Sequence, residues 1–286
     1  MLGKARRLGA CSSVAEAWAG APLLDHRPWP GTEAARKCRP PPGLPEWRAW
    51  LDPFSLVAMG LEGVVAVQHA HSKLLNEAAR QVLGPLGLTQ KGRSRTWLDD
   101  HGWWLGVVEF QPSSFGRGSY LNVGVNWLWT PKDYLSYDFG GRLDVGGYAE
   151  YETDDQFRPL AMKLAALASE EVARLRGLLP TVDAAAKRLA REKEPSVVEA
   201  IDAGIALGLT GDGDRAGRML ARYMTWFESD EEREWRIEDD SVLYDRARAL
   251  TTIVDDAERF REQVARDVQS ARSLLGLARV DPLAFE

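Results

Sequence analysis

Histidines beside carboxylates are the first residues in this chain that could perform acid–base chemistry. His101 follows Asp99 and Asp100 and precedes Gly102, and one interpretation is a small acid–histidine site. The other is a polar turn between two strands, because Asp-rich segments that end in glycine commonly form turns. The sequence favours the turn.

The sequence gives weaker evidence for a metal site or a nucleophilic residue than for the acid–histidine segment. His69 and His71 are separated by one residue, so they do not share a face of a helix and would need ligands from elsewhere. There is no Gly-x-Ser-x-Gly segment, and neither Cys11 nor Cys38 adjoins a histidine in a structured context. The pattern predicts no catalytic residues and no metal site.

The segment Gly211-Asp212-Gly213-Asp214 is the nearest approach to a phosphate-binding loop. It lacks the Walker lysine, and it places carboxylates where an anion would bind. It also lacks the glycine and the glutamate of a calcium-binding loop. We interpret it as a helix-capping loop with Asp214 as the cap, and no cofactor is expected.

Two segments, 103–111 and 120–129, have the composition of strands, and the loop 112–119 between them suits a hairpin. Alternation gives the second strand a wholly apolar side that includes Leu121 and Val125, and a polar side opposite. A hairpin would gather polar side chains on one face of the sheet, where they could bind a peptide, a base or a sugar ring. Alternatively, this face is half-exposed, or the C-terminal helices cover it through amide hydrogen bonds. The candidate binding residues are Trp103, Glu109, Gln111, Tyr120, Asn122, Asn126 and Arg142.

The remaining elements follow from periodicity and from helix-ending residues. The pattern predicts weaker strands at 94–98 and 142–148. It predicts helices over 64–83, over 156–176 with Asp154 or Asp155 as cap, over 181–192, from Pro195 to 207, and a helical hairpin within 203–224. A last long helix over 242–278 has a 4-3 apolar spacing. That spacing fits a coiled-coil seam for a homodimer, although packing on its own chain is the favoured interpretation.

Composition places this chain of 286 residues among globular proteins, with 45% hydrophobic and 27% charged residues. Residues 1–58 are rich in proline and carry a net charge of +3, so the remaining residues carry −9 of the total of −6. We expect three parts: an irregular or disordered extension (1–58), an α+β domain with a small antiparallel sheet flanked by helices (59–192), and a helical C-terminal region (193–286).

The expected location is cytoplasmic. No apolar run approaches the roughly 18 residues of a membrane span, and Arg6 and Arg7 leave no apolar region before the lipoprotein-like segment at Cys11. A disulfide between Cys11 and Cys38 is disfavoured, because a chain of this size does not need one.

Three segments together resemble a known family. They are Lys91-Gly92-Arg93, the run 107–113 with Phe110-Gln111-Pro112-Ser113, and the run 120–125 with Asn122-Val123-Gly124. Their order is similar to that in the bacterial family catalogued as domain of unknown function 4304 (DUF4304), over roughly residues 70–190. The resemblance implies an α+β fold with a small sheet and flanking helices. It implies no activity, cofactor or catalytic residues.

The sequence leaves three functional hypotheses. The first is a non-catalytic module that binds a protein partner through the sheet face and the amphipathic helices. The second is a domain that binds a small molecule or nucleotide, and that is conceivably an enzyme, through the same polar face. The third is nucleic-acid binding by the basic N-terminal segment; the negative net charge argues against it.

Overall fold

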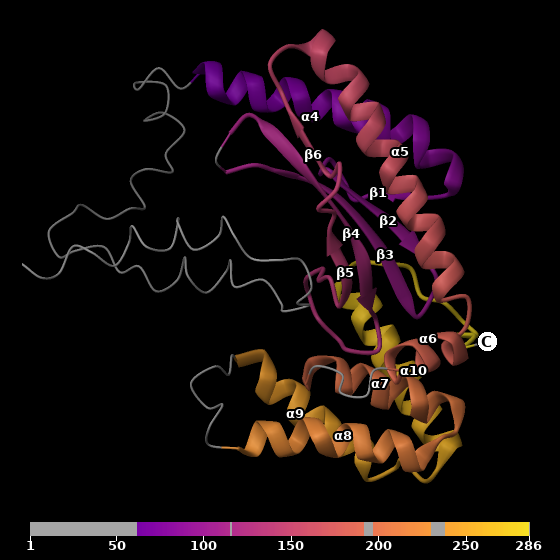
Figure 1. Ribbon diagram of the computed structural model, residues 1–286. Helices are drawn as coiled ribbons and strands as arrows, with labels where there is room; N and C mark the ends of the chain where they lie inside the picture. The colour runs from indigo at the N-terminus through magenta and orange to yellow at the C-terminus, as the bar shows by residue number, and fades with distance from the viewer. Residues whose placement is uncertain (1–61, 115, 192–196, 230–237, 286) are drawn as a thin grey trace, which may run out of the picture. The chain divides into compact units, whose positions relative to one another are not determined.

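The computed structural model describes residues 62–114, 116–191, 197–229 and 238–285. It has an α+β fold, as predicted, with a six-stranded antiparallel sheet followed by a helical C-terminal region (Figure 1). In chain order the elements are α4 (Glu62–Val82), η2 (Gly84–Leu86), β1 (Thr89–Gln90), β2 (Thr96–Asp100), β3 (Trp104–Pro112), β4 (Gly118–Trp127), β5 (Phe139–Arg142), β6 (Tyr148–Glu150), α5 (Asp154–Leu178), α6 (Val182–Leu189), α7 (Val197–Thr210), α8 (Gly213–Glu228), α9 (Glu238–Thr251) and α10 (Ala257–Leu274).

The sheet is built around the predicted hairpin. Its strand order is β1-β2-β3-β4-β5, and β6 pairs with the beginning of β4. The predicted strand at 142–148 is wrong: β5 ends at Arg142 and β6 begins at Tyr148. Gly146 lies in the interruption with a φ of 71°, which is outside the range of a regular strand. The short strand β1 was not predicted.

One face of the sheet forms the hydrophobic core. The apolar side of β4 is completely buried, from Leu121 to Trp127, and α4 and α5 lie across this face in Figure 1. Phe157, Leu164 and Leu175 of α5 belong to the same core. Alternation along β4 therefore identified the buried face correctly.

Helix α10 reaches one end of the other face. Arg272 of α10 is 1% exposed, and its Nη1 and Nη2 atoms donate to the two carboxylate oxygens of Asp100 at 2.8 and 2.7 Å. The same Nη1 donates to the carbonyl of Gly102 at 2.9 Å. A two-pronged contact of this kind fixes orientation as well as distance, so it orients α10 against the end of β2.

The predicted helix over 242–278 is wrong, because the chain breaks between α9 and α10. Asp256 caps α10 by accepting from the backbone N–H of Arg259 at 3.0 Å, and an N-cap residue has non-helical backbone angles. The coiled-coil positions Val264 and Val268 are buried within the described chain. Helix α10 packs closely on α7, where a Cβ at Gly208 would overlap the ring of Phe260.

Two predicted helix caps are also wrong. Thr153 caps α5 by accepting from the N–H of Gln156 at 3.2 Å, in place of Asp154 or Asp155. Asp212 caps α8 in place of Asp214. The capping oxygen must lie before the first helical residue, and both helices begin earlier than periodicity indicates.

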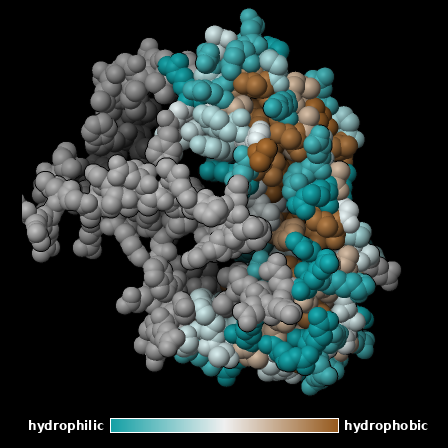
Figure 2. Space-filling view, viewed as in Figure 1, coloured by the Kyte–Doolittle hydropathy of each residue, from teal (hydrophilic) through white to brown (hydrophobic). Residues whose placement is uncertain are grey.

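Residues 61–286 form one compact unit. The expectations for residues 1–58, for Cys11 and Cys38 and for Pro195 concern positions outside the described residues. In the described part, no helix is both long and apolar enough to cross a membrane. Figure 2 shows apolar surface gathered over the region of α5, where Leu160 and Leu167 are only partly buried.

Candidate functional site

The β3–β4 register brings most of the predicted binding residues together on the face that α4 and α5 do not cover. Glu109 lies opposite Asn122, and Gln111 lies opposite Tyr120. Arg142 of β5 lies opposite Asn122 on its other side. Directly opposed residues project to the same face, so these five side chains form one group.

Hydrogen bonds connect this group. Asn122 donates through Nδ2 to Gln111 Oε1 at 2.9 Å and to Glu109 Oε2 at 3.2 Å. Arg142 Nη2 donates to the same Gln111 oxygen at 2.7 Å. The guanidinium carbon of Arg142 lies 4.2 Å from the centre of the Tyr120 ring, which is a favourable cation–π distance.

Tyr137 completes the group and was not predicted. Its hydroxyl donates to Glu109 Oε2 at 2.9 Å, and burial, with the nearby Glu109 carboxylate, raises the pKa of Tyr137 far above its ordinary value. The phenol therefore remains a donor. The only sequence signal was Gly124, where a Cβ would lie 2.9 Å from the Tyr137 ring. We call Glu109, Gln111, Tyr120, Asn122, Tyr137 and Arg142 the polar-face cluster.

Two predicted members lie elsewhere. Trp103 is 3% exposed and stacks on the rings of Trp127 and Trp129, at 5.8 and 5.3 Å between centroids. The reason is that Trp103 precedes β3, so strand alternation does not govern its direction. Asn126 is 1% exposed and accepts from the backbone N–H of Ser136 at 2.9 Å. It anchors a loop at the far end of β4.

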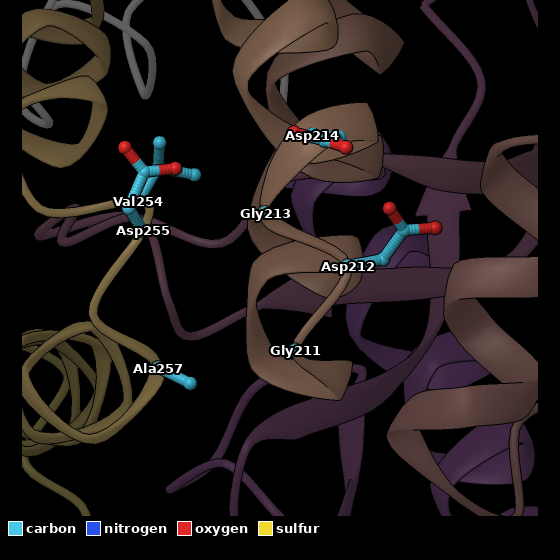
Figure 3. Close-up of a pocket in the computed structure, with 7 residues that line it drawn as sticks. All are labelled: Gly211, Asp212, Gly213, Asp214, Val254, Asp255 and Ala257. Atoms are coloured by element: carbon cyan, nitrogen blue, oxygen red, sulfur yellow. The ribbon is translucent and has the colours of Figure 1, made fainter.

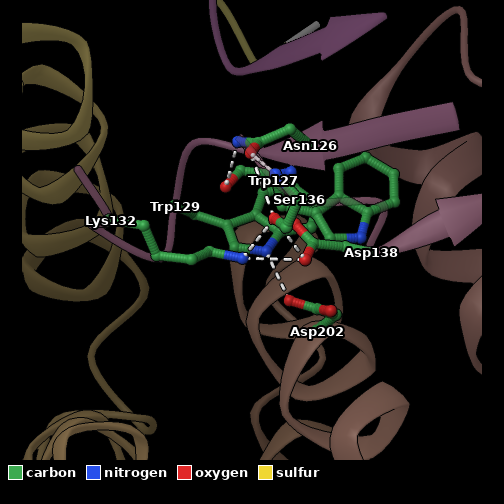
Figure 4. Close-up of polar contacts among 7 residues, drawn as sticks. All are labelled: Asn126, Trp127, Trp129, Lys132, Ser136, Asp138 and Asp202. Carbon is green, nitrogen blue, oxygen red and sulfur yellow. Dashed lines mark hydrogen bonds and ion pairs between the residues drawn. The ribbon is translucent and has the colours of Figure 1, made fainter. Parts of the chain in front are cut away.

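A second group of polar side chains joins the sheet to the helices (Figure 4). Trp129 donates through Nε1 to Asp202 Oδ1 of α7 at 2.9 Å. Burial, reinforced by the charge of Asp138, raises the pKa of Asp202 to about 7. Arg246 of α9 and Asp267 of α10 also belong to this group, and they form an ion pair at 2.5 Å. We call Trp129, Lys132, Asp138, Asp202, Arg246 and Asp267 the helix junction.

Ser136 and Lys132, beside this junction, have the residue types of a serine–lysine nucleophile. Lys132 Nζ lies 2.8 Å from Ser136 Oγ, but it also donates to Asp138 Oδ1 at 2.7 Å. Ser136 Oγ donates to the same Asp138 oxygen at 2.8 Å. Lys132 Nζ is the donor in both of its contacts, so it is not placed to accept the serine proton. The arrangement supports a structural role.

The residues of the acid–histidine segment make contacts that hold the fold together. Asp99 and Asp100 lie in β2, and the turn begins only at His101, whose ring stacks on Trp104 at 4.0 Å. Burial would raise the pKa of Asp99, but hydrogen bonds from His101 and Arg176 outweigh it and hold this pKa at about 2. Arg176 contacts both Asp99 oxygens, at 2.7 and 2.8 Å. These contacts tie α5 to β2.

Two cavities lie away from the polar-face cluster. One, of about 280 Å³, adjoins the loop between α7 and α8 and the residues Val254, Asp255 and Ala257. Figure 3 shows the side chains of Asp212 and Asp214 pointing away from Asp255. The other, of about 460 Å³, lies between α10 and the segment 279–283. No group of three or more His, Cys, Asp or Glu side chains in the described part is arranged to hold a metal ion.

Comparison with known proteins identifies no relative. No family model, no curated protein and no solved structure matches this chain. The resemblance to the DUF4304 family therefore stays a prediction, and the functional argument rests on the geometry of the site.

Proposed function

We propose that this chain is a non-catalytic protein-binding module whose contact surface is the polar-face cluster together with Tyr148. One observation carries the proposal: Arg142 lies over the Tyr120 ring and is held there by Gln111. The ring of Tyr148 packs against Tyr120 at 4.8 Å and is 43% exposed. Tyrosine and arginine are the residue types that most often dominate the binding energy of protein interfaces.

The hydrogen bonds beneath this surface favour binding further. Asn122 and Tyr137 fix Glu109 and Gln111 in one arrangement, so those side chains have little conformational freedom left to lose. Ordering flexible side chains is one of the main costs of association. A rigid platform on a sheet therefore binds with a smaller entropic penalty than a surface of mobile side chains.

The same surface leaves a donor and an acceptor for a partner. Within the described residues, Gln111 Nε2 and Glu109 Oε1 form no hydrogen bond. They lie two positions apart on one strand and on one face. This spacing suits the backbone amide groups of an extended protein segment.

Shape distinguishes this proposal from small-molecule binding at the same face. Small-molecule sites are concave and enclose most of their ligand. Neither of the two cavities described above lies at the polar-face cluster. The aromatic and amide groups of the cluster lie side by side on one face of the sheet, which suits another protein.

A binding measurement with matched variants tests the proposal. The full chain captures partners from a cell lysate, and each captured protein is then purified so that its Kd can be measured directly. We expect Tyr148→Ala and Gln111→Ala each to weaken binding about tenfold or more, because the first removes an aromatic anchor and the second removes the hydrogen bond that holds Arg142 over Tyr120.

Tyr134→Ala is the matched control. Tyr134 is 46% exposed, comparable to Tyr148, but it belongs to the loop near Asn126 at the other end of β4. Equal affinity in all three variants would contradict the proposal. Saturable thermal stabilisation by a metabolite that Gln111→Ala abolishes would favour the small-molecule alternative.

A further inference from the structure

Arg95 lies just before β2, on the opposite side of the sheet from the polar-face cluster. Its side chain is half-buried. Its Nη1 atom lies 3.2 Å from His71 Nε2 and donates to Ser119 Oγ at 3.2 Å. Both contacts come from other elements, α4 and β4, so two segments distant in sequence position this guanidinium.

The histidine contact is informative because arginine has no acceptor. His71 Nε2 must therefore accept the proton of Arg95. His71 is 2% exposed and lies between the rings of Tyr151 and Phe157, at 5.5 and 5.7 Å. A buried imidazole in this position restricts the orientation of the arginine that donates to it.

Nothing in the described part of the chain neutralises Arg95 by direct contact. Arg95 forms no ion pair with a described residue. Burial lowers the pKa of Arg95, and the charge of Glu109, which lies beyond ion-pair distance, only partly opposes this shift. Charges that leave water are ordinarily paired with an opposite charge, so this unpaired cation calls for a partner.

The remaining edge of the guanidinium is open. Nε and Nη2 of Arg95 form no hydrogen bond with described residues, and they are not sealed from solvent. These two atoms form the planar edge that binds two oxygens of a carboxylate or phosphate at once. Arg117, which is exposed, lies at the same end of the sheet, where its carbonyl accepts from the backbone N–H of Tyr151 at 2.6 Å.

We infer that Arg95 is the anchor of an oxyanion-binding site that accepts a carboxylate or phosphate group on its Nε–Nη2 edge. His71 and Ser119 hold the guanidinium in place, and Arg117 adds positive charge at the rim. The site is independent of the proposed protein-binding surface, because it lies on the other side of the sheet.

Titration of the full chain with inorganic phosphate, and separately with citrate, tests this inference. Ionic strength is held constant with sodium chloride, and binding is measured by calorimetry and by the shift of Tm. We expect saturable binding of at least one anion, weakened about tenfold or more in Arg95→Gln, since charge-assisted hydrogen bonds are the strong ones. Binding of phosphate alone, of citrate alone or of both would show which oxyanion group the site prefers.

Arg93→Gln is the matched control, because it removes an exposed arginine from the same turn. It should bind as the parent chain does. Equal weakening in Arg93→Gln and Arg95→Gln would mean general charge attraction and would overturn the inference. Absence of saturable binding for both anions would also overturn it.

Two measurements keep the inference testable if Arg95→Gln fails to fold. Arg95→Lys keeps the charge but cannot present two parallel donors, so we expect binding about tenfold weaker; full affinity would overturn the inference. In the parent chain, NMR of the arginine Nε–Hε groups should show one resonance, that of Arg95, moving with phosphate or citrate. An unmoved Arg95 resonance would likewise overturn it.

Discussion

The polar-face cluster and the helix junction both contain several polar or charged side chains, but they differ in how completely these side chains are hydrogen-bonded. On the sheet face, Asn122 and Tyr137 give Glu109 and Gln111 direct hydrogen-bond partners. In the junction, Arg246 Nε and Nη2 are buried without a hydrogen-bond partner. Leaving buried polar groups unpaired costs stability. No atom of the described polar-face cluster is both fully buried and unpaired, whereas the junction holds such atoms on a charged side chain, so we expect the stability of the junction to depend more strongly on charge.

Removing one charge of the junction should have the largest effect. In Asp267→Asn, the largely buried Arg246 loses its ion-pair partner. We expect a loss of about 3–5 kcal/mol in the free energy of unfolding, because a buried charge is left uncompensated. Urea unfolding measures it. Asp183→Asn is the control, since its pair with Lys187 is exposed and should contribute less than about 1 kcal/mol. Equal losses would refute the contrast.

Asp202→Asn should change how stability depends on pH. Burial raises the pKa of Asp202 to about 7, above an unfolded value of about 3.9. The folded state therefore retains a proton that the unfolded state releases, and the stability that this proton confers falls as pH rises from about 4 to about 7. The variant should lose this slope and exceed the parent by a few kcal/mol near pH 8. Urea midpoints across this range decide it, and an unchanged slope would contradict the assignment.

Asn122→Ala should change the free energy of unfolding by less than either junction variant. Asn122 is 5% exposed, and its loss removes three hydrogen bonds from a cluster that Tyr137 still partly supports. We expect a loss of about 1–2 kcal/mol, measured by urea unfolding at neutral pH. A loss as large as that of Asp267→Asn would mean that the two regions do not differ as described.

Arg142→Ala should have the smallest effect on stability. It removes the contact with the Tyr120 ring, a partly exposed hydrogen bond to Gln111 and a long one to Asn122, together worth about 0.5–1 kcal/mol. Thermal unfolding checks this value. Because the buried hydrogen bonds remain, any loss of partner affinity in this variant reports on the surface itself. A variant that unfolds outright would place Arg142 among the structural residues.

The sheet face was predictable because alternation is a local property of a strand. Glu109 and Asn122 follow from the period of two and from a recognisable hairpin loop. The helix junction was not predictable, because Trp129 and Asp202 are separated by 73 positions and no periodic pattern links them. Tyr137 lies in an irregular loop, so only Gly124 pointed to the space that it occupies.

The break between α9 and α10 shows a different limit. The apolar spacing continues through it because both helices bury one side, with Leu250 and Phe260 on either side of the break. Periodicity records burial, and it does not record whether the backbone stays helical. Asp256 was the available signal, since aspartate is a favoured N-cap.

The three stacked indoles give this protein an optical signature of its own. Trp127 and Trp129 lie 4.6 Å apart and nearly parallel, and Trp103 stacks on both. Because the three indoles lie this close, we expect coupling between them to appear in the near-ultraviolet circular dichroism band. Since Trp129 also donates to Asp202, protonation of that carboxyl should alter the band and the fluorescence. The state of the junction can therefore be read without any added label.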